Sequence, residues 1–376
     1  MWSDETSSQR SSLNRVVRVL HVGPGWGQLG GIASMMGELE NLQARFRRAN
    51  IVFSFFETHG FQSTRNLLGF TLLDLPRFVW VLMRDVDIVH LHVSVRGSFY
   101  RKFLLSLFVK LTGRKTIFHL HAGNFDRFES RAGKFTRLAI SRFVRGADAT
   151  VAVSSAIGQQ LIRLGVHPAK LYVIGNTAGS AEFVEDAGLP TLKNDDGGYL
   201  AFAGRLVEAK GIGDLLKALA LLRAAGCVIS LRLAGVGDVH HWQRMARDFQ
   251  VDDLVTFVGW LDGDAKLAFY RNARIFCMPS HYESFGISTL EAMFSGVPVI
   301  GTRLGGFLDL VEEGVTGYLV EPSSPQALAA RIRRLVEDPK LAGRMGKAGL
   351  ARARQRYSTE ALSNLYVRCY RDVVAH

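Results

Sequence analysis

The chain has 376 residues, of which 48 % are apolar, so it is long enough and apolar enough for two domains with separate hydrophobic cores. Residues 1–14 are polar and are typical of a disordered tail without a secretory signal. The apolar stretch 67–83 contains Asp74, Pro76 and Arg77, so it falls short of a membrane-spanning helix. Three cysteines without metal-ligand spacing favour a reducing cytoplasm.

The net charge of +12 is confined to the first half of the sequence. Residues 1–180 contain 23 Lys and Arg against 11 Asp and Glu, whereas residues 181–376 contain 23 of each kind. Because an excess of one sign favours an oppositely charged partner, we expect the first half to face nucleic acid or an anionic membrane.

Apolar runs alternate with helical segments along the whole chain. We expect strands at 15–23, 51–56, 87–93, 115–121, 149–154 and 170–175, then a Gly-, Asp- and Asn-rich linker at 186–198, and a new strand at 199–203 that begins a second alternation. Strands that alternate with helices are typical of parallel sheets in doubly wound domains. The sequence therefore predicts an α/β protein with two Rossmann-like domains that face a cleft.

The most informative stretch, residues 279–292, places two carboxylates on either side of a strand-to-helix turn. Glu283 follows the apolar run 273–278, which predicts a buried strand, and open α/β sheets bind ligands at the carboxyl ends of their strands. The backbone amides of 285–288 suit a phosphate, and Glu291 lies further along the helix expected at 287–294. Solvated glutamates at a helix start are the alternative. Two carboxylates around an amide nest match the layout of a nucleotide-sugar.

Two cations follow the first strand of the second half. Arg205 and Lys210 are expected on the loop between this strand and a helix at 213–222. They suit a diphosphate leaving group, because a guanidinium and an ammonium stabilise negative charge that grows in the transition state. The alternative is a solvated basic loop, and the Gly-Lys-Ser/Thr of a Walker A loop is absent from this segment.

The Glu-x7-Glu pair in its Ser-x-Tyr-Glu-Ser-Phe-Gly context resembles the donor-site signature of retaining GT-B glycosyltransferases of family 4, also called group 1, of the bacterial polysaccharide-biosynthesis type. Five further segments resemble the same family: Phe202–Gly211, Leu231–Asp238, Val255–Gly259, Gly296–Thr302 and Gly314–Val320. The resemblance covers essentially the whole chain and is stronger after about residue 198.

This resemblance implies a GT-B fold with an acceptor-binding domain at 15–185, joined by a helix at 357–376 that crosses back, and a nucleotide-sugar domain at 198–356. It implies retaining transfer of a hexose-type sugar from a UDP- or GDP-sugar by front-face substitution, with no cofactor and no metal ion. The implied catalytic residues are His121, Glu283, Arg205 and Lys210. The implied donor-binding residues are Gly30, Gly31, Arg205, Lys210, Glu283, Ser284, Phe285, Gly286, Ile287 and Glu291.

Two polar motifs have both a functional and a structural interpretation. His119 and His121 lie two positions apart on one expected strand and so point to the same face. His121 matches the family's cleft histidine and could orient hydroxyls, whereas His119 is expected in the core. The similarly spaced His90 and His92 are assigned no role. Asp262-Gly-Asp264 resembles the metal motif of other glycosyltransferases but lies where Asp caps a helix.

The anionic partner is expected to be a membrane. Residues 100–115 are basic and apolar, with Arg101, Lys102, Lys110, Arg114 and Lys115 near the ends, and such a helix can lie on an anionic leaflet unless its apolar side is core. We expect a cytoplasmic enzyme, peripheral on the inner face of the cell membrane, that extends a lipid-linked saccharide in exopolysaccharide or cell-envelope glycan assembly. No RRM, KH or zinc-knuckle pattern favours nucleic acid.

The main rival interpretation is an NAD-dependent oxidoreductase. Gly25, Gly27 and Gly30 fit Gly-x-Gly-x-x-Gly after a strand, and Glu57 closes the second strand as a ribose-binding acid would. This interpretation leaves the second half of the sequence unexplained.

Overall fold

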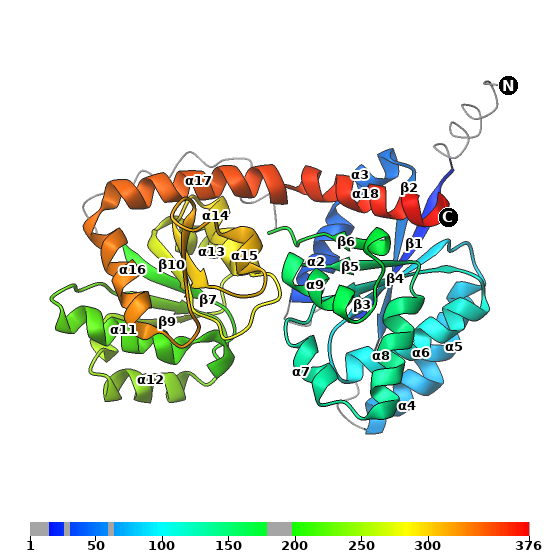
Figure 1. The fold of residues 1–376 in the computed structure, drawn as a ribbon, viewed down its shortest axis with the longest axis horizontal. Helices are drawn as coiled ribbons and strands as arrows, with labels where there is room; N and C mark the ends of the chain where they lie inside the picture. The colour runs from blue at the N-terminus through cyan, green and yellow to red at the C-terminus, as the bar shows by residue number, and fades with distance from the viewer. Residues whose placement is uncertain (1–14, 26–30, 59–63, 179–197, 376) are drawn as a thin grey trace. The chain divides into compact units, whose positions relative to one another are not determined.

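The computed structural model describes residues 15–25, 31–58, 64–178 and 198–375 (Figure 1). The expected tail, most of the linker, and Gly27 and Gly30 lie outside the described residues. Two compact units are present: unit 1 comprises residues 1–176 and 359–376, and unit 2 comprises residues 177–358. Among the described residues, no helix is both long enough and apolar enough to cross a membrane.

Unit 1 is built on a six-stranded parallel sheet. In spatial order its strands are β2 (Ile51–Thr58), β1 (Val17–Pro24), β3 (Ile88–Val93), β4 (Lys115–Leu120), β5 (Ala149–Ala152) and β6 (Leu171–Val173). Every residue of β3 is buried, as expected for a parallel strand covered on both faces.

The helices of unit 1 pack on both faces of this sheet (Figure 1). They are α2 (Gly31–Asn41), α3 (Gln43–Arg48), α4 (Thr64–Gly69), the π-helix η1 (Phe70–Asp74), α5 (Leu75–Leu82), α6 (Gly97–Leu111), α7 (Phe125–Ser130), α8 (Lys134–Gly146), α9 (Ser155–Arg163), the 3₁₀ helix η2 (Pro168–Lys170) and α18 (Thr359–Ala375). The last helix, α18, contacts β1 and α3. Its buried residues Leu362, Tyr366 and Val373 recur at helical spacing, so one stripe of α18 completes the core.

Unit 2 repeats the same architecture. Its parallel sheet has the order β12 (Gly317–Val320), β11 (Val299–Thr302), β10 (Ala273–Met278), β7 (Tyr199–Ala203), β8 (Leu231–Ala234) and β9 (Val255–Gly259). Its helices are η3 (Glu208–Lys210), α11 (Ile212–Ala224), α12 (Val239–Asp248), η4 (Asp252–Leu254), α13 (Gly263–Arg271), α14 (Ile287–Phe294), α15 (Phe307–Leu310), α16 (Pro325–Glu337) and α17 (Pro339–Tyr357).

The strand order of unit 2 fixes where a ligand can bind. The chain runs outward from β7 to β8 and β9 on one side, then returns to β10 and continues outward to β11 and β12 on the other. The direction therefore reverses between the neighbouring strands β7 and β10. Open α/β sheets bind ligands beyond the carboxyl ends of the strands at such a switch point.

Candidate functional site

The residues selected from the sequence of unit 2 follow the two strands of this switch point. Arg205 and Lys210 follow β7, and Glu283 follows β10. The two loops are tied together, since the His281 amide donates to the Ala209 carbonyl at 2.9 Å. The structure thus brings one cationic loop and one acidic loop to the same edge of the sheet.

Gly211 permits this close approach. Its φ is +71°, and a Cβ atom at this position would lie 1.9 Å from the carbonyl oxygen of Pro279. Any other residue would clash with backbone and strain its own conformation. A second connection comes from His281, whose Nε2 lies 2.8 Å from Asp214 Oδ2 on α11.

Lys210 and Glu283 form an ion pair. Lys210 Nζ donates to Glu283 Oε2 at 2.6 Å, and the two side chains are 20 % and 12 % exposed. The other carboxylate oxygen, Oε1, accepts from the Ser284 amide at 3.2 Å. Arg205 is exposed, and no described residue forms a hydrogen bond or ion pair with its guanidinium. The edge therefore offers a fixed cation, a fixed carboxylate and a free guanidinium.

The turn into α14 is shaped by glycines. Gly286 has φ +104° and occupies the N-cap of α14, where no side chain caps the helix. The first amides of a helix have no carbonyl partner within that helix. Gly305 packs against the same segment, since a Cβ there would lie 1.8 Å from the Glu283 carbonyl oxygen. Phe285 is buried, and its ring lies 5.5 Å from that of Tyr357. Ser284 and Ile287 flank this turn and are half-buried.

Glu291 is held by two residues that the sequence reasoning missed. Lys266 Nζ donates to Glu291 Oε1 at 3.1 Å, and the Tyr270 hydroxyl donates to Oε2 at 2.7 Å. Burial, and then the nearby Glu291 charge, raise the pKa of Tyr270 well above its usual range. Lys266 and Tyr270 lie four positions apart on α13, so they share one helix face. This spacing indicates that the two side chains act together, but it does not point to Glu291 as their partner. A carboxylate has about four acceptor sites, so Glu291 keeps capacity for hydroxyls of a ligand.

His121 in unit 1 directly follows β4. Its backbone amide donates to the Val93 carbonyl at 2.9 Å, and its Nε2 lies 3.0 Å from Nδ1 of His92. Burial lowers the pKa of His121 to about 3, so the imidazole is neutral at physiological pH. His119 is fully buried, as its deeper place in the strand predicted. Gly31 opens α2, and Glu57 pairs in register with Gly23.

Two sequence expectations need correction. Arg101 and Lys102 are buried on α6, so they cannot contact a membrane surface. Lys102 Nζ donates to Thr58 Oγ1 at 2.9 Å, and burial, followed by the Arg101 charge, lowers the Lys102 pKa to about 7 although Asp74 acts to raise it. Asp262 occupies the N-cap position of α13, as expected, but its side chain forms no capping hydrogen bond.

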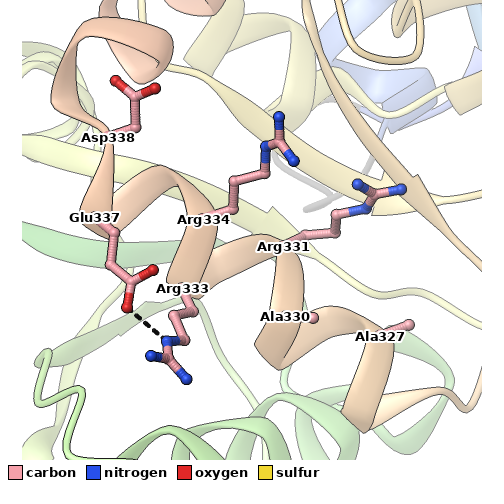
Figure 2. A pocket seen from close by; sticks show the side chains of 7 residues that line it. All are labelled: Ala327, Ala330, Arg331, Arg333, Arg334, Glu337 and Asp338. Atoms are coloured by element: carbon pink, nitrogen blue, oxygen red, sulfur yellow. Dashed lines mark hydrogen bonds and ion pairs between the residues drawn. The ribbon is translucent and has the colours of Figure 1, made fainter.

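A surface hollow lies along α16, outside the residues described above. Figure 2 shows its lining, which includes three arginines. Arg333 pairs with Glu337, and Arg331 pairs with Glu313 and lies over the Tyr318 ring. Because two of the three arginines already have acidic partners, we assign no ligand to this hollow.

Comparisons with known proteins agree with this geometry. The model described as Glycosyl transferases group 1 matches residues 189–352, and the model described as Glycosyltransferase Family 4 matches residues 43–178. The chain belongs to the group 1, family 4 glycosyltransferases. Both matches favour this family over the oxidoreductase interpretation, which rested on a glycine pattern that the structure describes only in part.

Individual relatives are distant. A glycogen synthase of Mycobacterium tuberculosis is 31 % identical over 277 residues, which cover 73 % of this chain and 65 % of that protein. A D-inositol 3-phosphate glycosyltransferase of Pseudarthrobacter chlorophenolicus is 36 % identical over 41 % of this chain and 38 % of its own length. The alignments therefore span less than two thirds of these relatives.

The solved structure of Anabaena HepE in complex with UDP and glucose has a similar fold. It aligns with a TM-score of 0.71 and 19 % identity over 94 % of this chain and 98 % of that chain. With the two parallel sheets, this likeness identifies the glycosyltransferase as a two-domain GT-B fold.

Proposed function

We propose that this glycosyltransferase moves a hexose from a UDP- or GDP-sugar to a saccharide acceptor with retention of the anomeric configuration. The observation that carries the proposal is the Lys210–Glu283 ion pair at the switch point of unit 2, with Glu291 on the following helix. Anabaena HepE was solved in complex with UDP and glucose, which makes a uridine donor the first one to test.

Each group has a distinct role in the proposed reaction. Arg205 and Lys210 bind the diphosphate and stabilise the charge that accumulates on it as the glycosidic bond breaks. The free amides at the start of α14 bind the same phosphates. Glu283 binds hydroxyls of the donor sugar, and Glu291 binds those of the ribose. In a front-face substitution the leaving phosphate takes the proton of the acceptor hydroxyl, and no metal ion takes part.

The test is transfer by the full chain with a panel of UDP- and GDP-sugars and saccharide acceptors, followed by an anomeric proton spectrum of the first product. We expect nucleotide release that depends on the acceptor and an α linkage in the product. An inverted linkage would refute the retaining mechanism. A thermal shift with NAD or NADP but with no nucleotide-sugar would refute glycosyl transfer.

We further propose that unit 1 binds an anionic membrane that holds a lipid-linked acceptor in cell-envelope glycan assembly. Because Arg101 and Lys102 are buried, the candidate surface lies not at the ends of α6 but on residues 67–84, from α4 to just after α5. This segment exposes six large apolar side chains: Leu67, Leu68, Leu72, Leu73, Trp80 and Met83. Arg77 and Arg84 are also exposed here, and the Arg84 guanidinium lies 3.5 Å from the centre of the Trp80 ring. Apolar side chains with adjacent arginines suit the interface of an anionic leaflet.

Liposome co-sedimentation tests this surface. Binding should require anionic lipid and weaken as salt rises, because the cations are screened. The double change Leu72→Ser and Leu73→Ser should reduce binding, whereas Val228→Ser, at an equally exposed apolar position in unit 2, should not. The proposal would be contradicted if the wild-type protein did not bind anionic liposomes at low salt, or if the double variant bound them as well as the wild type.

A further inference from the structure

Five histidines and one tyrosine of unit 1 form a continuous hydrogen-bonded chain, which we call the histidine chain. It begins at the half-buried His121 and ends at the fully buried His119. Its five steps are His121 Nε2 to His92 Nδ1 at 3.0 Å, His92 Nε2 to His21 Nδ1 at 3.0 Å, His21 Nε2 to the Tyr370 hydroxyl at 3.4 Å, that hydroxyl to His90 Nδ1 at 3.0 Å, and His90 Nε2 to His119 Nδ1 at 2.9 Å.

Strand register brings these rings together. His21 of β1 pairs with His90 of β3, and His92 of β3 pairs with His119 of β4. Residues paired in register, and residues two apart on one strand, lie on the same face of a sheet. Helix α18 packs on this face and supplies Tyr370, which joins the two halves of the histidine chain.

The members of the histidine chain must share one direction of donation. Burial lowers the pKa of all five histidines, so each ring is neutral and has one N–H donor and one bare nitrogen acceptor. A ring that donates at one nitrogen therefore accepts at the other. If the Tyr370 oxygen accepted from both His21 and His90, its own buried O–H would have no acceptor within the histidine chain. Apart from that arrangement, only two satisfy every step: all five histidines protonated on Nδ1, or all five protonated on Nε2.

The buried end selects between these arrangements. Among the residues that the structure describes, none forms a hydrogen bond with the buried His119 Nε2. None forms one with the buried hydroxyl of Tyr366 either, whose ring lies 6.4 Å from that of His119. An orphaned buried N–H is rarer than an under-satisfied acceptor. His119 Nε2 is therefore the bare nitrogen, and donation runs from His119 toward His121.

We propose that the histidine chain locks His121 in its neutral Nδ1–H tautomer, so that His121 can donate a hydrogen bond through Nδ1 but cannot act as a base there. His92, His21 and Tyr370 are then positioning residues. In the proposed glycosyl transfer, His121 orients an oxygen lone pair of a substrate; this consequence rests on the proposed function, whereas the tautomer does not.

A metal ion is the competing explanation for these rings. The ligand nitrogens of His90, His92 and His119 lie within 4.8 Å of one another, and all three residues are buried. However, both nitrogens of His90 and of His92 already have partners in the histidine chain. A metal ion would have to replace these hydrogen bonds. The complete histidine chain therefore favours a hydrogen-bonded network over a metal site.

Nitrogen-15 NMR of histidine-labelled full-length protein between pH 6.5 and 8 tests the proposal, because two-bond correlations identify the protonated nitrogen of each ring. We expect Nδ1–H in all five histidines and no titration. His92→Phe removes the donor to His121 Nε2, so His121 should populate both tautomers while His90 and His119 keep theirs. Tyr172→Phe is the control, since its hydroxyl bonds Asp372 on α18 outside the histidine chain.

Three results would overturn the proposal: Nε2–H at His121 in the wild type, an unchanged single tautomer at His121 in His92→Phe, or about one zinc ion per chain by elemental analysis of the purified protein. If His92→Phe does not fold, the wild-type tautomers and the metal content still decide. None of these measurements needs a substrate, so a failure of the proposed glycosyl transfer would be recognised separately.

Discussion

Lowering the pH from 7.5 to 5.5 should destabilise unit 1 far more than unit 2. His21, His90, His92 and His119 are fully buried, and burial lowers the pKa of each in the folded state. The unfolded chain titrates near pH 6.5, so below this pH it binds protons that the folded state excludes. Stability therefore falls as the pH drops through 6.5 and continues to fall until the folded pKa values are reached.

The size of this effect follows from the number of buried rings. Each histidine that remains neutral in the fold loses about 1.4 kcal/mol of stability between pH 7.5 and 5.5, so four lose about 5 kcal/mol. This loss is comparable to the whole stability of many domains, about 5–15 kcal/mol. With an m-value of about 2 kcal/mol per molar urea, the unfolding midpoint of unit 1 should fall by about 2.5 M.

Urea unfolding followed by hydrogen-exchange mass spectrometry at the two pH values checks this prediction. Exchange in β3 and β4 reports the unfolding of unit 1, and exchange in β7 and β10 reports the unfolding of unit 2. The three histidines of unit 2, His240, His241 and His281, are not buried, so its midpoint should change little. A unit 1 midpoint that stays within about 0.5 M would show that the histidines are not held neutral by burial.

Three further predictions concern the donor site. Glu291→Gln keeps an acceptor for the Tyr270 hydroxyl but removes the negative charge, so UDP binding should weaken by about 1.5–3 kcal/mol in calorimetry. A dissociation constant unchanged within about twofold would contradict the proposal that Glu291 binds the ribose hydroxyls. Arg205→Ala and Lys210→Ala should lower kcat more than donor affinity, because leaving-group charge peaks in the transition state; full turnover in the double variant would exclude their role. Excess EDTA, and Asn at Asp262 and Asp264, should leave transfer intact, and activity restored only by Mn²⁺ or Mg²⁺ would show a metal requirement.

The sequence predicted the two sheets well because strands buried on both faces leave long apolar runs that alternate with helices. The expected strands at 199–203 and 273–278 match β7 and β10, and the expected helix at 287–294 matches α14. Gly296 has φ +71° just after this helix, as expected for a residue that ends a helix. Local sequence carries these features, because each depends on neighbours within one element.

Contacts between elements were predicted less well. Lys266 and Tyr270 reach Glu291 from α13, and no local pattern shows that α13 packs against α14. The histidine chain depends on register across β1, β3 and β4 and on Tyr370 of α18, which lies 280 positions from His90 and 349 from His21 in the sequence. Spacing of two residues predicted a shared face but could not show which rings meet.

The basic helix at 100–115 shows how composition can mislead when periodicity is ignored. Phe99, Lys102, Ser106 and Val109 recur at helical spacing and are all buried. Lys102 therefore belongs to the apolar stripe of α6 although it is a cation. Its hydrogen bond to Thr58 compensates part of the cost of burying it.

Hydrogen exchange of the full chain, measured with and without saturating UDP, locates the nucleotide that we propose to bind at the switch point of unit 2. We predict slower exchange in residues 204–213 and 279–291, which contain Lys210, Glu283 and Glu291. Protection confined to the residues that follow β1 in unit 1, or no protection by any nucleotide or nucleotide-sugar, would contradict binding at this switch point.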